Sequence, residues 1–358
     1  FVSVGATAKI GLKLGEGKKD EAEKILGNVF FIFILMSIFL MFFGNLFLDI
    51  ILYGLGANES TFAFARDYLK ILINFLFFLL FPFGMLGLMQ AEGNPKKAMI
   101  GGLIGAFGNI FLDPLFIFTF KLGIKGAAYA TAFSNVFVAI YVIYHFVYSK
   151  KRNLTLKLEN FKPYWNLIAE VMRIGISPFL RKIATSVTIL VVNKSLISYG
   201  GSSSVAVLGI IDTISTVNFI VVMGINEGAQ PIISYNYGAT NYKRVKEAIF
   251  KSLRASTIIG IFALIIVILF QDKIIGVFTK DLALIAEVKE ALLIYMLMTP
   301  LLGFHTLGVN FFQAIDRSRV AIFLNLFRKV MLLIPMILIL SRNFGKMGIW
   351  YANPISDF

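Results

Sequence analysis

Residues 90–98 read Gln-Ala-Glu-Gly-Asn-Pro-Lys-Lys-Ala, and residues 313–321 read Gln-Ala-Ile-Asp-Arg-Ser-Arg-Val-Ala. The two stretches lie 223 positions apart, and the same offset relates Gly5-Ala6 to Gly228-Ala229. An offset one residue shorter relates Gly123, Gly126 and Tyr129-Ala130 to Gly345, Gly348 and Tyr351-Ala352. In an apolar chain, a two-fold internal repeat of this kind is typical of two similar helical lobes with a substrate path between them.

The composition excludes a soluble protein, since 58% of the residues are hydrophobic, 15% are charged and the mean hydropathy is +0.81. Apolar runs of about 20 residues, long enough to cross a bilayer core, recur along the chain. We therefore predict an all-α integral membrane protein. The predicted spans are 28–54, 68–90, 98–120, 126–148, 176–198, 204–226, 254–276, 291–313 and 320–341. Residues 1–13 and 347–358 have the composition of partial spans, so we expect a fragment that lacks material at both ends.

The net charge of +14 reflects membrane topology rather than nucleic-acid binding. Lysine and arginine concentrate in alternate loops, at 13–24, 96–97, 150–162, 243–254 and 317–319, and are sparse in the loops between them. By the positive-inside rule these basic loops lie in the cytoplasm. We expect a multi-pass protein of the bacterial cell (inner, cytoplasmic) membrane, in contact with the lipid bilayer and without a nucleic-acid partner.

The longest polar stretch divides the chain. We predict an N-terminal lobe at 1–148, a cytoplasmic inter-lobe loop at 149–163 and a C-terminal lobe at 164–358, with a short surface helix at 163–175. The glycines at 101, 102, 105 and 108 lie along one helix, and this spacing predicts close helix packing.

Charge inside a span is costly, so Asp113 is the strongest candidate for a functional residue. Asn109 lies one turn earlier on the same helix face. If the next helix forms an antiparallel hairpin about residue 122, Thr131 lies level with Asp113, and Asn135 with Asn109. These four residues would supply an all-oxygen site for Na⁺ or a carboxylate for one proton.

A structural role for Asp113, capping the backbone beside Pro114, is the alternative. The second repeat has no acid in the matching segment 332–336, Leu-Leu-Ile-Pro-Met. An acid present in one lobe only is harder to explain as scaffolding common to both.

Weaker candidates lie in the second lobe. Asp212, Asn193 and Glu227 are candidates for lining a central cavity, although hydrogen bonding between helices is the favoured explanation for Asp212 and Asn193. His145 and His305 lack metal-ligand spacing and the chain has no cysteine, so we predict no metal site apart from Na⁺ at Asn109, Asp113 and Thr131.

Several motifs give the chain a resemblance to a known family. Residues 224–239, Gly-Ile-Asn-Glu-Gly-Ala-Gln-Pro-Ile-Ile-Ser-Tyr-Asn-Tyr-Gly-Ala, resemble the eighth-helix signature of the multidrug and toxic compound extrusion (MATE) family. The segments 90–95, 109–114, 126–131 and 350–354 are similar to further MATE motifs in the same order. The family belongs to the multidrug/oligosaccharidyl-lipid/polysaccharide flippase superfamily.

The resemblance implies twelve helices in two pseudo-symmetric six-helix lobes. It places this sequence from late in helix 2 to the start of helix 12. Asn109, Asp113 and Thr131 would correspond to the N-lobe cation site of one branch of the family, and a further Asp of that site would precede Phe1. Another branch uses an acid in helix 7, and residues 177–188 contain none.

The function that follows is secondary active multidrug efflux, in which organic cations are antiported against Na⁺ or H⁺ by a monomer without a cofactor. The alternative is a lipid-linked oligosaccharide flippase of the same superfamily, which tends to need several basic residues in its cavity. We found only Arg181, Lys182 and Lys194 in mid-span. An enzyme is disfavoured because no catalytic constellation occurs, and a passive channel because the two-lobe repeat favours alternating access.

Overall fold

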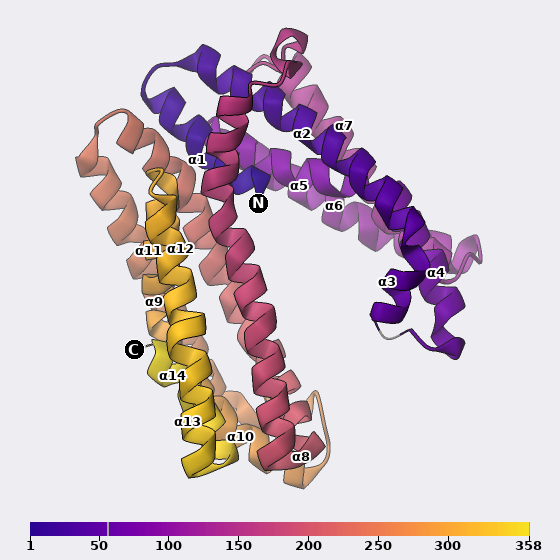
Figure 1. Cartoon of the computed structure of the whole chain (residues 1–358), viewed down its shortest axis with the longest axis vertical. Coiled ribbons are helices and arrows are strands. Elements are labelled where there is room, and N and C mark those ends of the chain that lie inside the picture. The colour runs from indigo at the N-terminus through magenta and orange to yellow at the C-terminus, as the bar shows by residue number, and fades with distance from the viewer. Residues whose placement is uncertain (56, 358) are drawn as a thin grey trace. The chain divides into compact units, whose positions relative to one another are not determined.

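The computed structural model describes residues 1–55 and 57–357, and these residues divide into two compact units (Figure 1). One unit comprises residues 2–172, and the other comprises Phe1 together with the chain from Arg173 onward. Within the described part every regular element is helical. This agrees with the physics of a bilayer, where a helix satisfies all backbone hydrogen bonds within one segment.

The first unit contains seven α-helices and the beginning of an eighth. They are α1 (Val2–Gly15), α2 (Lys19–Leu46), α3 (Leu48–Gly54), α4 (Glu59–Asn74), α5 (Leu76–Ala91), α6 (Pro95–Pro114) with the π-helical turn η1 (Leu115–Thr119), α7 (Ile124–Tyr148) and the 3₁₀ turn η2 (Leu158–Phe161). Caps set several boundaries. Asn58 forms a capping box with Thr61 at the start of α4, and Pro95 begins α6 where its missing N–H costs nothing.

The second unit begins within α8 (Trp165–Gly238), which is broken at Gly201 (φ 72°, ψ −174°). It continues with α9 (Tyr242–Gly276), α10 (Leu282–Met296), the 3₁₀ turn η3 (Thr299–Leu301), α11 (Leu302–Ala314), α12 (Ser318–Leu326), the π-helical turn η4 (Phe327–Leu333), α13 (Ile334–Phe344) and α14 (Lys346–Asp357). Its core packs aliphatic side chains around Trp350, which is 1% exposed.

The number of spans agrees with the prediction. By length and composition, eight helices in the described part can cross a membrane, and a ninth span forms if α4 and α5, bent by 57°, count as one. Two expectations are corrected. The predicted span 28–54 is interrupted at Phe47, and the predicted surface helix at 163–175 is the first part of α8, because the chain remains helical through Pro178.

The sequence repeat is also a backbone repeat. Three pairs of residues with positive φ are separated by 223 or 222 positions: Gly17 (75°) with Thr240 (55°), Gly93 (92°) with Asp316 (60°), and Gly123 (55°) with Gly345 (57°). Non-helical breaks also recur at an offset of 223, at Phe47 and Phe270 (ψ 16° in both) and at Phe75 and Met298 (ψ 14° and 8°). The two halves therefore share helix ends and kinks as well as composition.

Two equivalent glycines allow close backbone approach. A Cβ on Gly126 would lie 2.7 Å from the Phe116 carbonyl, and one on Gly348 would lie 2.0 Å from the Leu340 oxygen. The predicted close packing of α6 is confirmed at Gly101, whose Cβ would meet Leu86 at 2.5 Å, and at Gly105, which approaches Val138. Gly102 faces open space, so the prediction was wrong for that position.

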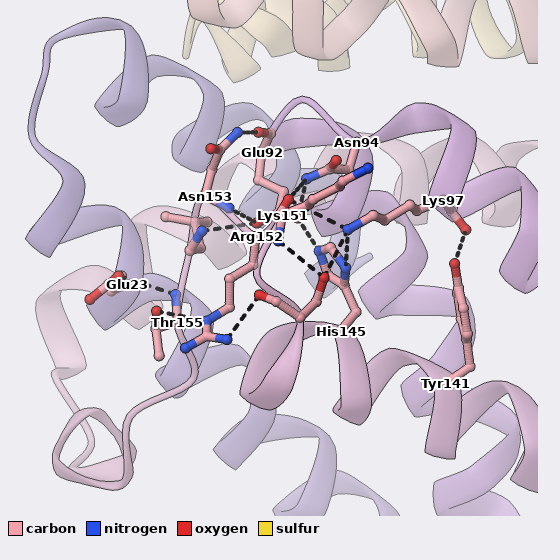
Figure 2. Close-up of polar contacts among 12 residues, drawn as sticks. Glu23, Glu92, Asn94, Lys97, Tyr141, His145, Lys151, Arg152, Asn153 and Thr155 are labelled. Carbon is pink, nitrogen blue, oxygen red and sulfur yellow. Dashed lines mark hydrogen bonds and ion pairs between the residues drawn. The ribbon is translucent and has the colours of Figure 1, made fainter.

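The 149–164 stretch is bound to the first unit by buried carboxylate and amide side chains (Figure 2). Glu92, 2% exposed in the turn between α5 and α6, accepts the backbone N–H groups of Asn153 (3.1 Å) and Leu154 (2.9 Å) and contacts His145. Glu23 accepts the N–H of Thr155 at 3.1 Å. The linker is therefore a fixed part of this unit, and the predicted lobe boundaries remain a prediction.

Gly126→Ala should destabilise the protein by about 1–3 kcal/mol, because the added methyl group cannot fit against the Phe116 backbone. The midpoint of thermal unfolding, followed by tryptophan fluorescence, should fall by several degrees. Gly102→Ala is the matched control and should leave the midpoint unchanged or raise it, since alanine favours helix by about 1 kcal/mol. Equal midpoints for the two variants would contradict the close contact.

Glu92→Gln should loosen the 149–164 stretch, since an amide accepts fewer hydrogen bonds than a carboxylate at this buried position. Trypsin cleavage at the lysines and arginines of 150–162 should become several-fold faster. Glu159→Gln, on an exposed side chain of the same stretch, should leave the cleavage rate unchanged. Cleavage of Glu92→Gln at the wild-type rate would show that this carboxylate does not hold the linker.

Candidate functional site

The structure brings two of the four predicted N-lobe residues, Asn109 of α6 and Thr131 of α7, together, and Asn135 lies one turn after Thr131 on α7. Asn109 Nδ2 lies 3.5 Å from Thr131 Oγ1. Asn135 Nδ2 donates to the Thr131 carbonyl oxygen at 2.8 Å, and Ser134 Oγ donates to the same oxygen at 2.9 Å. The Asn109, Thr131 and Asn135 side chains are half-buried, so the group forms a polar patch inside an apolar helix pair.

The helix hairpin is centred near residue 121, one position before the predicted centre. Gly101 faces Tyr141, each twenty residues from Lys121, and Phe116 contacts Gly126, each five residues away. Asp113 is therefore level with Tyr129, and Thr131 lies deeper, opposite Asn109. Residues 120–123 join the two helices, and the midpoint of this connection lies before residue 122.

Asp113 itself stands apart from this hydrogen-bonded group. It is half-buried near the end of α6, and within residues 1–55 and 57–357 no hydrogen bond or ion pair engages its carboxylate. Pro114 follows and cannot donate a backbone hydrogen bond. The Asp113 carboxylate thus lies one helical turn from the Asn109 amide on α6. Its assignment as the coupling residue remains a prediction.

The second unit contains a cavity of about 350 Å³ with charged side chains in its wall. Tyr295 Oη donates to Asp212 Oδ1 at 3.3 Å, and Lys329 Nζ donates to Thr185 Oγ1 at 2.8 Å. Arg328 and Asp357, which also line this cavity, form an ion pair with each other. Pockets of this size with apolar walls and a few polar groups are typical of small-molecule sites.

The other predicted residues have different surroundings. Asp212 both lines the C-lobe cavity and accepts a hydrogen bond between helices. Asn193 and Glu227 lie on α8 outside the lining of this cavity, Asn193 half-buried and Glu227 exposed. Their proposed role in lining a central cavity remains a prediction. Among the described residues no group of three or more His, Asp or Glu side chains is placed to hold a metal ion.

Sequence reasoning missed the basic residues of the cavity. Arg328 and Lys329 lie in the middle of the predicted 320–341 span, and their omission from the mid-span bases was an error. An Arg-Lys pair inside an apolar run was sufficient signal to find them. No pattern in the sequence indicated that Tyr295 and Asp357 would face the same space, because this depends on the packing of α10 and α14.

The sequence profile of the MatE family matches residues 1–115 and 179–339. The multidrug export protein MepA of Staphylococcus aureus (strain bovine RF122 / ET3-1) is 30% identical over 356 residues, covering 99% of this chain and 78% of its own length. The chain belongs to the MATE family. A second relative, MepA of Staphylococcus saprophyticus, is 31% identical over 305 residues, covering 85% of this chain and 66% of its own length.

Solved MATE structures have the same fold. An outward-facing multidrug resistance MATE family transporter of the MOP superfamily gives a TM-score of 0.93 at 22% identity, covering 99% of this chain and 80% of its own. A MOP superfamily transporter from Pyrococcus furiosus, whose binding pocket is described as having reverse polarity, gives 0.92 at the same identity and coverage. The predicted fold class, an all-α membrane protein of the MATE type, is confirmed.

In this MATE protein Arg328→Met should destabilise the second unit by about 3–5 kcal/mol, because it leaves Asp357 buried without its partner. The double variant Arg328→Met/Asp357→Asn should recover most of the loss, since it removes both charges. Chemical unfolding of the purified protein measures both effects. Additive losses in the double variant would show that the two side chains do not interact.

Proposed function

We propose that this protein is a secondary active multidrug efflux transporter that antiports organic cations against Na⁺ or H⁺. The observation that carries the proposal is the 30% identity to a multidrug export protein over 99% of the chain. We further propose that it works as a monomer in the bacterial cell membrane, without a cofactor and without enzymatic activity. Up to nine apolar spans in the described part of the chain, and the polar groups in both units, support the membrane location and a transport role.

In our proposal the coupling ion binds at Asp113, where Na⁺ would find further oxygen ligands on Asn109 and Thr131. A proton would instead bind the carboxylate alone. Either ion neutralises a half-buried charge that has no hydrogen-bond or ion-pair partner among the described residues. Inverting a two-state equilibrium from 1:99 to 99:1 requires about 5.5 kcal/mol.

Coupling requires that ion and drug favour different conformations, or compete for the same group. In the proposed cycle, entry of the ion at Asp113 favours the state that releases the drug outside. A tightly bound drug with equal affinity for both states would not be pumped. The Asp113 carboxylate meets this requirement if a cationic drug and the ion exclude one another there.

A lipid-linked oligosaccharide flippase is the second candidate, and one observation favours it. Arg328 and Lys329 add two bases at membrane depth to Arg181, Lys182 and Lys194, and basic side chains would suit a pyrophosphate group. Asp212 and Asp357 line the same cavity and offset that positive charge. This balance makes an anionic lipid-linked substrate the weaker of the two proposals.

Asp113→Asn should lower the initial rate of ion-driven ethidium transport about tenfold or more, because the amide can neither bind a proton nor offer full charge to Na⁺. The protein, expressed from its complete gene, is assayed in inverted vesicles under a Na⁺ gradient alone and under a pH gradient alone. The gradient that drives uptake identifies the ion.

Asp20→Asn, an exposed acid in the first turn of α2, is the matched control and should transport normally. Normal transport by Asp113→Asn at equal expression would reject the site. A correctly inserted wild-type protein that moves no organic cation under either gradient would reject antiport of drugs and favour the flippase.

A further inference from the structure

The cavity of the second unit contains two opposite charges that have only neutral partners. Lys329 donates to the Thr185 hydroxyl, and Asp212 accepts from the Tyr295 hydroxyl. In the described part of the chain neither side chain forms an ion pair. Their neighbours differ in this respect, since Arg328 and Asp357 pair with each other.

Charges at membrane depth are normally paired, because an isolated ion loses its hydration without compensation. Lys329 lies eleven residues into its span, and Asp212 lies nine residues after Ser203, where its span begins. Each is thus close to the middle of a bilayer core of about 30 Å, at a rise of about 1.5 Å per residue. Among the described residues neither charge is in direct contact with an opposite charge, so a bound molecule that carries both signs would supply a contact partner for each.

The walls of the cavity fit the rest of such a molecule. Phe219, Leu208 and Ile189 give it apolar surface, and its volume of about 350 Å³ suits one small aromatic compound. Three further polar atoms in its lining, Ser215 Oγ, Asn218 Oδ1 and Arg328 Nε, are buried without a hydrogen-bond partner in the described part. Unsatisfied polar atoms that converge on one space indicate a site for a ligand or ordered water.

We propose that this cavity binds zwitterionic aromatic compounds, whose anionic group contacts Lys329 and whose ammonium group contacts Asp212. The π turn η4 supports this geometry. In a regular α-helix, neighbouring side chains such as those of Arg328 and Lys329 point in different directions, but here both line the cavity. The inference deepens the proposed efflux function, on which it rests for the role of the cavity as a substrate site.

Two dansyl compounds test the proposal directly. Nε-dansyl-L-lysine carries an ammonium and a carboxylate, and dansylcadaverine is the same molecule without the carboxylate. The chain has two tryptophans, and Trp350 lines the cavity. In purified Trp165→Phe protein, energy transfer from Trp350 to the dansyl group therefore measures occupancy of the cavity without any ion gradient or transport step.

Lys329→Gln should weaken binding of Nε-dansyl-L-lysine about tenfold or more and change that of dansylcadaverine by less than twofold. Lys329→Arg, which keeps the charge, should retain most of the affinity for the zwitterion. Asp212→Asn should weaken both compounds, because both carry the ammonium group. Arg342→Gln, an exposed base on α13, should affect neither.

Three results would overturn the inference: no energy transfer from Trp350 with either compound, equal losses for both in Lys329→Gln, or unchanged binding of the zwitterion in that variant. Thermal unfolding of each variant shows whether a loss of binding reflects a loss of folding. Binding is measured here without transport, so the two proposals can fail separately. If the protein binds the dansyl compounds saturably but moves no organic cation in the vesicle assay, antiport is rejected and the assignment of the cavity as a binding site stands.

Discussion

The need to neutralise charge inside an apolar helix bundle is the constraint on which this structure depends. Where the protein supplies the partner, the result is rigidity, as when Glu92 accepts two backbone N–H groups or Arg328 pairs with Asp357. Where the described residues leave a charge with neutral neighbours or none, as at Asp113 and Lys329, we propose that a ligand supplies the neutralising charge.

The two halves share a backbone but differ in these charges. Gly123 and Gly345 have nearly the same φ angle, and Gly126 and Gly348 both lie in close contact with the backbone of the preceding helical segment. The position of Asp113 is occupied by Met336 in the second half, whereas the Arg328-Lys329 pair falls on Gly105 and Ala106 of the first. At these equivalent positions the duplicated fold thus places an acid in one unit and bases in the other, and the two polar sites have different chemistry.

Hydropathy and the repeat were sufficient to predict the helices, because lipid leaves the backbone few alternatives to a helix. Hairpin geometry predicted Asp113 level with Thr131 and Asn109 level with Asn135, whereas the structure brings Asn109 to Thr131, because the centre of the hairpin lies one residue earlier. The C-lobe cavity could not be derived in the same way. Tyr295 and Asp357 are distant in sequence, and only packing shows that they share a space with Asp212.

The central claim is that an ion at Asp113 is exchanged for an organic cation. The most direct measurement uses proteoliposomes with no imposed ion gradient, in which an ethidium gradient is applied while internal Na⁺ and pH are recorded. We predict that ethidium moving in one direction drives one of these ions in the other, and that Asp113→Asn abolishes this countermovement. Ethidium flux without movement of either ion, or countermovement that persists in Asp113→Asn, would contradict the account.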